Sequence, residues 1–158
     1  MTVKRKSYKF RLYPNQEQQQ LFAKTFGCSR AIWNMMLADK IKHYEDTKET
    51  LYNTPAQYKN EFPWLREVDS LALCNVQLNL QTAYKNFFQS GFGFPKFKKK
   101  SHHQSYKTNN NNGNIALENG YVKLPKVGLV KVKAHPESGH VRIVVVTMIE
   151  ILTQVLTF

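Results

Sequence analysis

The spacing of hydrophobic residues changes along the chain, and each spacing predicts a different kind of element. Near the N-terminus, Tyr8, Phe10 and Leu12 alternate with Lys9 and Arg11. Because successive side chains on a strand point to opposite faces, this alternation predicts a half-buried strand with one basic face. The proline that soon follows ends the strand, because proline cannot donate to a sheet ladder.

Hydrophobic residues then recur at intervals of three and four, which is typical of amphipathic helices. One helix is predicted from its N-cap Asn15 to about Phe26, with Gly27 as the residue that ends it. A second helix is predicted from about Ser29 to Tyr44. Two helices joined at a glycine fit a helix-turn-helix that binds duplex DNA, and an ordinary antiparallel helix pair is the alternative.

Two more helices follow after a polar loop. Pro55 suits the first turn of a short helix that runs to about Phe62. Asp69 or Ser70 then caps a long helix that runs to about Phe88, with hydrophobic residues again at helical spacing. The helical region as a whole is therefore predicted to form a small bundle.

The last third of the chain has short hydrophobic runs separated by turn residues. The predicted strands are residues 114–117, 121–124, 129–133 and 140–146. Several short strands with regular turns indicate a small β-barrel or sandwich, which the N-terminal strand would join. The expected class is α+β, with the helical bundle inserted after the first strand. The expected units are residues 1–14 and 92–146 (barrel), 15–91 (helical bundle, helix-turn-helix-like at 15–44) and 147–158 (an atypical tail).

The net charge of the chain indicates the kind of partner that the protein binds. The 158 residues carry a formal net charge of +12, which points to a polyanionic partner such as RNA or DNA. No stretch approaches the roughly 20 apolar residues that span a bilayer, so no membrane partner is expected. Cys28 and Cys74 form no disulfide or metal-binding pattern, and His102 with His103 lacks a third ligand. We expect a cytoplasmic protein without a cofactor or metal.

Lysines and aromatic residues gather between residues 92 and 107. Lysines attract phosphates, and exposed rings can stack on unpaired bases. A solvated surface and a half-buried strand are the alternatives for this stretch. The residues predicted to bind nucleic acid are Arg5, Lys9, Arg11, Arg30, Lys96, Phe97, Lys98, Lys99, Lys100, Tyr106 and Lys107.

Four stretches of the chain resemble the TnpB (OrfB) family of insertion-sequence proteins associated with transposases. They read Tyr8-Lys-Phe-Arg-Leu-Tyr-Pro14, Phe26-Gly-Cys-Ser-Arg-Ala-Ile-Trp-Asn34, Leu80-x-x-Ala83-Tyr-Lys-Asn-Phe-Phe88 and Phe94-Pro-Lys-Phe-Lys-Lys99. The resemblance implies the N-terminal half of an RNA-guided DNA endonuclease. It implies an oligonucleotide-binding, wedge-type β-barrel with an inserted helical recognition domain that holds guide RNA and contacts DNA. It also implies a link to DNA transposition and recombination.

The chain lacks the residues that carry catalysis in this family. Its aspartates, Asp39, Asp46 and Asp69, all lie in the helical part, and the acidic residues of a RuvC-like nuclease and the zinc-binding cysteine pairs are missing. We therefore expect a non-enzymatic member, truncated before the nuclease domain. Its expected partners are guide RNA or DNA and a full-length relative that shares the RNA. The alternatives are a helix-turn-helix fragment that binds duplex DNA, a complete catalytic transposition protein, and a protein-interaction module with incidental charge.

Overall fold

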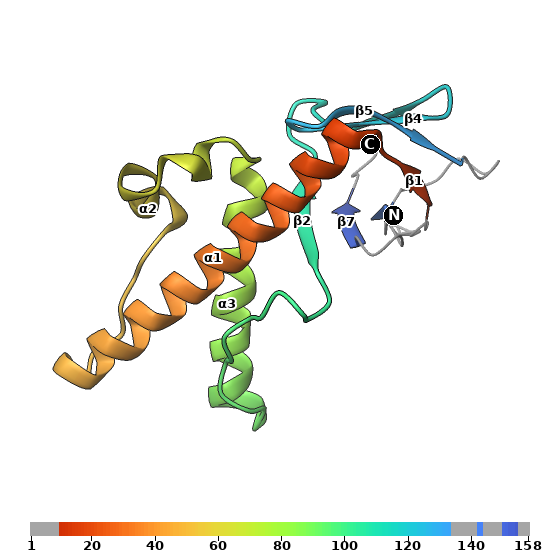
Figure 1. Cartoon of the computed structure of the whole chain (residues 1–158). Coiled ribbons are helices and arrows are strands. Elements are labelled where there is room, and N and C mark those ends of the chain that lie inside the picture. Colours follow the sequence, from red (N-terminus) through yellow and green to blue (C-terminus); the bar gives the residue numbers. More distant parts are fainter. Residues whose placement is uncertain (1–9, 134–141, 144–149, 155–158) are drawn as a thin grey trace.

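The computed structural model describes residues 10–133, 142–143 and 150–154, and it confirms the α+β class (Figure 1). The helices are α1 (Gln16–Thr47), α2 (Pro55–Glu61), η1 (Pro63–Arg66, a 3-10 helix) and α3 (Ser70–Ser90). The strands are β1 (Leu12–Tyr13), β2 (Ser105–Asn109), β3 (Ala116–Glu118), β4 (Tyr121–Leu124), β5 (Gly128–Val132), β6 (Arg142–Ile143) and β7 (Glu150–Gln154).

The strands form two sheets. The first is antiparallel with the order β1-β5-β4-β3, and it pairs Leu12 with Val132, so the strand before the helices joins strands that follow them. The predicted strands near 114–117, 121–124 and 129–133 correspond to β3, β4 and β5. The specific wedge-type barrel remains a prediction. The first part of the predicted N-terminal strand, with Arg5 and Lys9, lies outside the described residues.

The second sheet contains elements that the sequence pattern missed. Its order is β2-β7-β6, with β2 parallel to β7. Strand β2 lies at the end of the lysine-rich stretch, for which a strand had been only an alternative interpretation. Strand β7 falls within the stretch expected to be an atypical tail. Strand β6 coincides with the middle of the predicted strand at 140–146, whose other residues lie outside the described part. Pairing across more than forty residues is a tertiary contact that local patterns do not show.

Helix α1 corrects the prediction of two helices that meet at Gly27. It continues without interruption from Gln16 to Thr47 and crosses the molecule (Figure 1). Buried residues at positions 22, 26, 29, 33 and 36 keep a spacing of four, three, four and three across the glycine. Gly27 does not have the positive φ that would end a helix. The apolar stripe is therefore in register on both sides of Gly27, and packing favours one helix.

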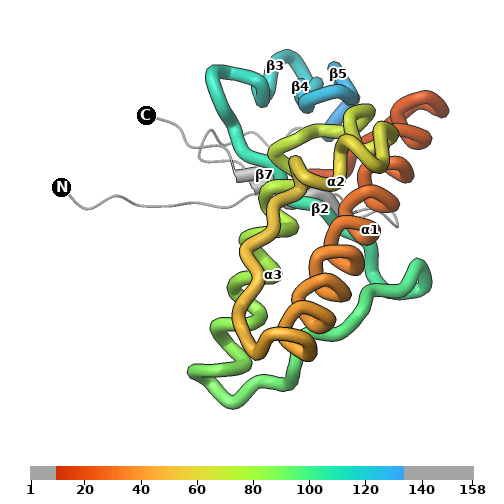
Figure 2. Tube along the Cα trace, turned by 90° about the vertical axis from the view of Figure 1, so that its left-hand side faces the viewer, coloured from red at the N-terminus to blue at the C-terminus, as the bar shows by residue number. Residues whose placement is uncertain are grey.

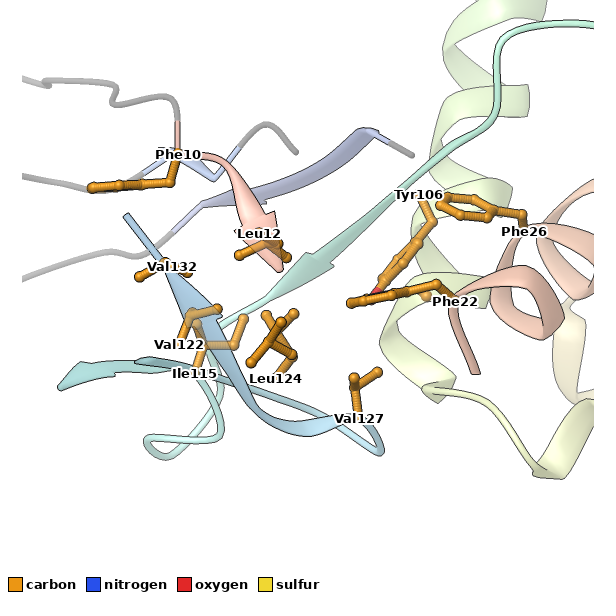
Figure 3. Packing of buried hydrophobic residues seen from close by; sticks show 12 residues of the cluster. Phe10, Leu12, Phe22, Phe26, Tyr106, Ile115, Val122, Leu124, Val127 and Val132 are labelled. Carbon is orange, nitrogen blue, oxygen red and sulfur yellow. The ribbon is translucent and has the colours of Figure 1, made fainter. Parts of the chain in front are cut away.

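The two halves of α1 lie in different hydrophobic cores. The first half contributes Phe22 and Phe26 to a core with the first sheet, which includes Leu124 and Val132 (Figure 3). The second half contributes Ile32 and Met36, among others, to a core between the helices. Helix α1 therefore ties the sheet to the helical part and fixes their relative position.

The ends of the helices are fixed by caps that the sequence largely predicted. The Asn15 side chain accepts from the Gln18 N–H at 2.9 Å, and the Gln18 side chain accepts from the Asn15 N–H at 3.0 Å. Asp69 caps α3 by accepting from the Leu71 N–H at 3.1 Å. Gly91 ends α3 with a φ of 67°, a left-handed conformation that glycine adopts without strain. That turn sends the following segment back along α1 (Figure 2).

Candidate nucleic-acid interface

The segment between α3 and β2, residues 92–104, is here named the basic strap. It is extended for most of its length, and its backbone is bound to α1 by side chains. Trp33 Nε1 donates to the Lys96 carbonyl at 2.9 Å. Asn34 Nδ2 donates to the Lys98 carbonyl at 3.0 Å, and Asn34 Oδ1 accepts from the Lys98 N–H at 2.8 Å. The strap therefore follows α1, where Figure 2 shows it passing.

Three hydrogen bonds are a substantial restraint for a segment without a strand partner. Each contributes roughly 0.5–1.5 kcal/mol net, and more is lost when a partner is left unsatisfied. Pro95 is buried, and it supports the extended backbone because its ring fixes φ. Beyond Lys98 the strap turns, with the His102 N–H donating to the Lys99 carbonyl at 3.1 Å. The backbone is thus positioned while the lysine side chains project from it.

The strap lysines differ in their surroundings. Lys96, Lys98, Lys99 and Lys100 are all exposed as residues. The Lys98 ammonium, however, lies 4.1 Å from the centre of the Trp33 ring, a cation–π contact. Partial burial of this ammonium lowers the pKa of Lys98. Lys98 therefore helps to hold the strap on α1, whereas Lys96, Lys99 and Lys100 are the strap lysines best placed to approach phosphates.

The remaining predicted residues are only partly brought together. Arg11 is exposed beside β1 and is not among the residues that line the pocket described below. Arg30 is half-buried, and its guanidinium donates to Gln104 Oε1 at 3.3 Å. Lys107 is half-buried on β2. Arg30, Lys98, Lys99 and Lys107 line one pocket, so this subset of the predicted residues forms a common basic site.

Tyr106 differs from the other predicted residues that the structure describes, because it is buried. Its side chain is only 5% exposed, and its ring centre lies 6.5 Å from that of Phe22 and 5.7 Å from that of Phe26 (Figure 3). Burial raises the pKa of Tyr106. Tyr106 therefore belongs to the sheet core, and it also lines the pocket, so its role in nucleic-acid binding stays a prediction. Phe97 is 50% exposed on the strap, so its ring is accessible and its stacking role stays a prediction.

The residues that hold the strap were not predicted from the sequence. Trp33, Asn34 and Gln104 had no assigned role there. A usable signal was present, because Trp33 and Asn34 close the second family-like stretch while Lys96 and Lys98 lie in the fourth. The structure shows that these two stretches contact each other.

No metal site accompanies the basic surface in the part of the chain that the structure describes. There, no group of three or more His, Cys, Asp or Glu side chains is placed to hold an ion. The helices of that part are also too short or too polar to cross a membrane.

Comparison with known proteins places the chain in a class. Residues 1–49 match a family model described as a helix-turn-helix domain and named for OrfB of IS605. A "Putative RNA-guided DNA endonuclease" of Streptomyces pristinaespiralis is 31% identical over 101 residues, which cover 60% of this chain and 25% of that protein. The "Putative RNA-guided DNA endonuclease InsQ" of Escherichia coli (strain K12) is 30% identical over 132 residues. These residues cover 79% of this chain and 33% of that protein.

These matches define a transposase-associated protein of the kind that insertion sequences encode. The chain is a homologue of the N-terminal part of the TnpB (OrfB) family, as its motifs predicted. It spans a quarter to a third of the length of the two relatives.

Proposed function

We propose that this chain binds single-stranded nucleic acid, guide RNA first of all, through the basic strap. The observation that carries the proposal is the pairing of Asn34 with Lys98, which holds an extended backbone whose lysines face solvent. A positioned row of cations binds a phosphate backbone at a lower entropic cost than flexible lysines do. Exposed Phe97, between Lys96 and Lys98, adds a ring on which a base can stack.

The relatives support this proposal through their names, which describe RNA-guided DNA endonucleases. For the present chain we propose binding rather than catalysis, with the described sheets as parts of a wedge-type, oligonucleotide-binding barrel and the helices as its recognition part. A full-length relative that uses the same RNA would then compete with the chain for it. Duplex binding by a helix-turn-helix at residues 15–44 has less support, because α1 is one continuous helix.

The test is a salt series with single-stranded RNA and duplex DNA of equal length. Replacing Lys99 and Lys100 with alanine should weaken RNA binding, and it should flatten the slope of log affinity against log salt by about 0.7 for each phosphate that the variant no longer neutralises. The matched control replaces two other exposed lysines, Lys42 on α1 and Lys123 on β4, and removes the same charge. Equal slopes for both double variants, or a wild-type preference for the duplex, would overturn the proposal.

A further inference from the structure

A pocket of about 340 Å³ lies beside the strap, enclosed by α1, α3, the turn of the strap and the start of β2. It is here named the basic pocket. The strap lysines alone would bind any phosphate backbone, so the proposed function does not require a pocket. Its buried and its more exposed lining residues differ in chemistry, and that difference indicates what it would hold.

The buried residues that line the basic pocket are mostly apolar. They include Phe26 of α1, Ala72 and Val76 of α3, and Tyr106 of β2. Side chains from three elements therefore form one apolar floor. A bare phosphate gains nothing from such a surface, whereas the flat face of a nucleobase does.

One polar atom on this floor has no partner. Ser29 is 6% exposed and lines the pocket, and its hydroxyl makes no hydrogen bond within the described residues. By contrast, Thr25, one turn earlier on α1, has a partner for its buried hydroxyl, which donates to the Leu21 carbonyl at 2.8 Å. A buried hydroxyl without a partner is costly, and one that can both donate and accept suits the polar edge of a base.

The more exposed residues that line the pocket include cations. Arg30, Lys99 and Lys107 are among them, and none of the lining residues that the structure describes is Asp or Glu. The Arg30 guanidinium is positioned by Gln104 Oε1 at 3.3 Å. A mostly apolar floor with the unpaired Ser29 hydroxyl, together with lining cations, matches a nucleotide, which has a flat base at one end and a phosphate at the other.

The size and position of the pocket indicate a nucleotide within a strand. Its volume is at the small end of the roughly 300–1,000 Å³ range of ligand pockets, which suits one nucleotide. Lys98 and Lys99 belong to both the strap and the pocket lining. A phosphate backbone on the strap would therefore pass directly over the pocket.

We propose that the basic pocket holds one unstacked nucleotide of the single-stranded RNA that the strap binds. The base lies against Phe26 and Val76 with its edge at the Ser29 hydroxyl, and its phosphate lies between Arg30 and Lys99. This inference rests on the proposed function. It adds to it a base-dependent part of the affinity, since a strap alone would bind a backbone with or without bases.

The experiment compares an oligoadenylate RNA with an abasic ribose-phosphate strand of equal length. The variant is Asn79→Trp, because Asn79 is exposed on α3 and lines the pocket, so a large ring there fills it without disturbing a core. Gln81→Trp, at an exposed position on α3 outside the pocket lining, is the matched control. Ser29→Ala is a second, smaller change that keeps the proposal testable if the tryptophan variant does not fold.

The wild type and Gln81→Trp should bind oligoadenylate about tenfold or more tightly than the abasic strand. Asn79→Trp should lose most of that preference while its affinity for the abasic strand and its salt slope stay unchanged, and Ser29→Ala should reduce the preference severalfold. A preference that persists in Asn79→Trp would place the base on Phe97 and overturn the pocket. Free adenosine monophosphate that binds as tightly as the strand would overturn the strand assignment. If the proposed binding by the strap were itself wrong, the result would differ from these outcomes, because neither the oligoadenylate nor the abasic strand would bind in a salt-dependent way.

Discussion

Asn34 pairs with Lys98 through both polar atoms of its side-chain amide. Its Oδ1 accepts from the Lys98 N–H at 2.8 Å and its Nδ2 donates to the Lys98 carbonyl at 3.0 Å. The amide thus satisfies both backbone groups of one residue, as a neighbouring strand would do. Because the contact joins residues 64 positions apart, the shape of the lysine-bearing strap depends on a side chain of α1.

Replacing Asn34 with alanine should loosen the strap without weakening α1, because alanine is the best helix former. The free energy of unfolding should fall by about 1–3 kcal/mol, since two backbone groups lose their partner. RNA affinity should fall severalfold because the exposed lysines are no longer held in position. Urea unfolding and a binding titration measure the two effects. Gln20→Ala, at an exposed position on the same helix, is the control, and equal behaviour of the two variants would contradict this role of Asn34.

Alanine variants of Tyr106 and Phe97 should have different effects on stability and on RNA binding. Tyr106→Ala should destabilise the fold by about 3–5 kcal/mol, because it leaves a cavity beside Phe22 and Phe26 in the sheet core. Phe97→Ala should change the stability by less than about 0.5 kcal/mol, because the ring is half exposed. It should weaken RNA binding by roughly 1–3 kcal/mol if the ring stacks on a base. Thermal unfolding measures the stability of each variant, and an RNA titration measures its binding. A stable Tyr106→Ala protein would refute the burial of that ring.

Gly27 and Gly91 should respond in opposite ways to alanine. Gly27→Ala should stabilise the protein by about 0.5–1 kcal/mol, because α1 is continuous there and a Cβ meets nothing within 4 Å. Gly91→Ala should destabilise it by about 1–2 kcal/mol, because φ at Gly91 is +67°. Chemical denaturation of both variants measures the difference. A loss of stability in Gly27→Ala would instead support two helices that break at this glycine.

The two cysteines should differ in reactivity. Burial raises the pKa of the Cys28 thiol from 9.0 to about 11, whereas Cys74 is exposed. A thiol reagent at neutral pH should therefore modify Cys74 in the folded protein and reach Cys28 only on unfolding. Mass spectrometry before and after denaturation checks this result, with Cys74→Ser as the control. Rapid modification of Cys28 in the folded chain would show that its position is accessible.

The same pKa gives stability a pH dependence. In the unfolded chain the Cys28 thiol ionises near its ordinary pKa of 9.0, whereas in the folded chain it stays neutral until about 11. The folded state therefore holds a proton that the unfolded state releases between these values, and the free energy of unfolding should fall as the pH rises through them. Urea unfolding on both sides of pH 9 measures the fall, which should be smaller in Cys28→Val. An unchanged slope in that variant would assign the effect to other groups.

Local elements were predictable wherever their signals are complete within a few residues. The N-cap Asn15, the proline at the start of α2 and the strand Tyr121–Leu124 were predicted where the structure has them, and the cap of α3 was predicted at Asp69 or Ser70. The lysine-rich character of the strap was equally visible. Caps, turn residues and alternating hydrophobic positions act through contacts between near neighbours, so the pattern alone contains them.

Features that depend on contacts with a distant segment could not be predicted and follow from the tertiary structure. Gly27 lies inside a helix because the hydrophobic residues on both sides of it meet cores that the local sequence does not reveal. Strand β2 exists because β7 pairs with it, and Tyr106 is buried because α1 supplies Phe22 and Phe26. Asn34 acquires its role only when the strap folds back onto α1. These outcomes follow from packing and hydrogen bonding between segments far apart in the chain, and no local pattern encodes which segments will meet.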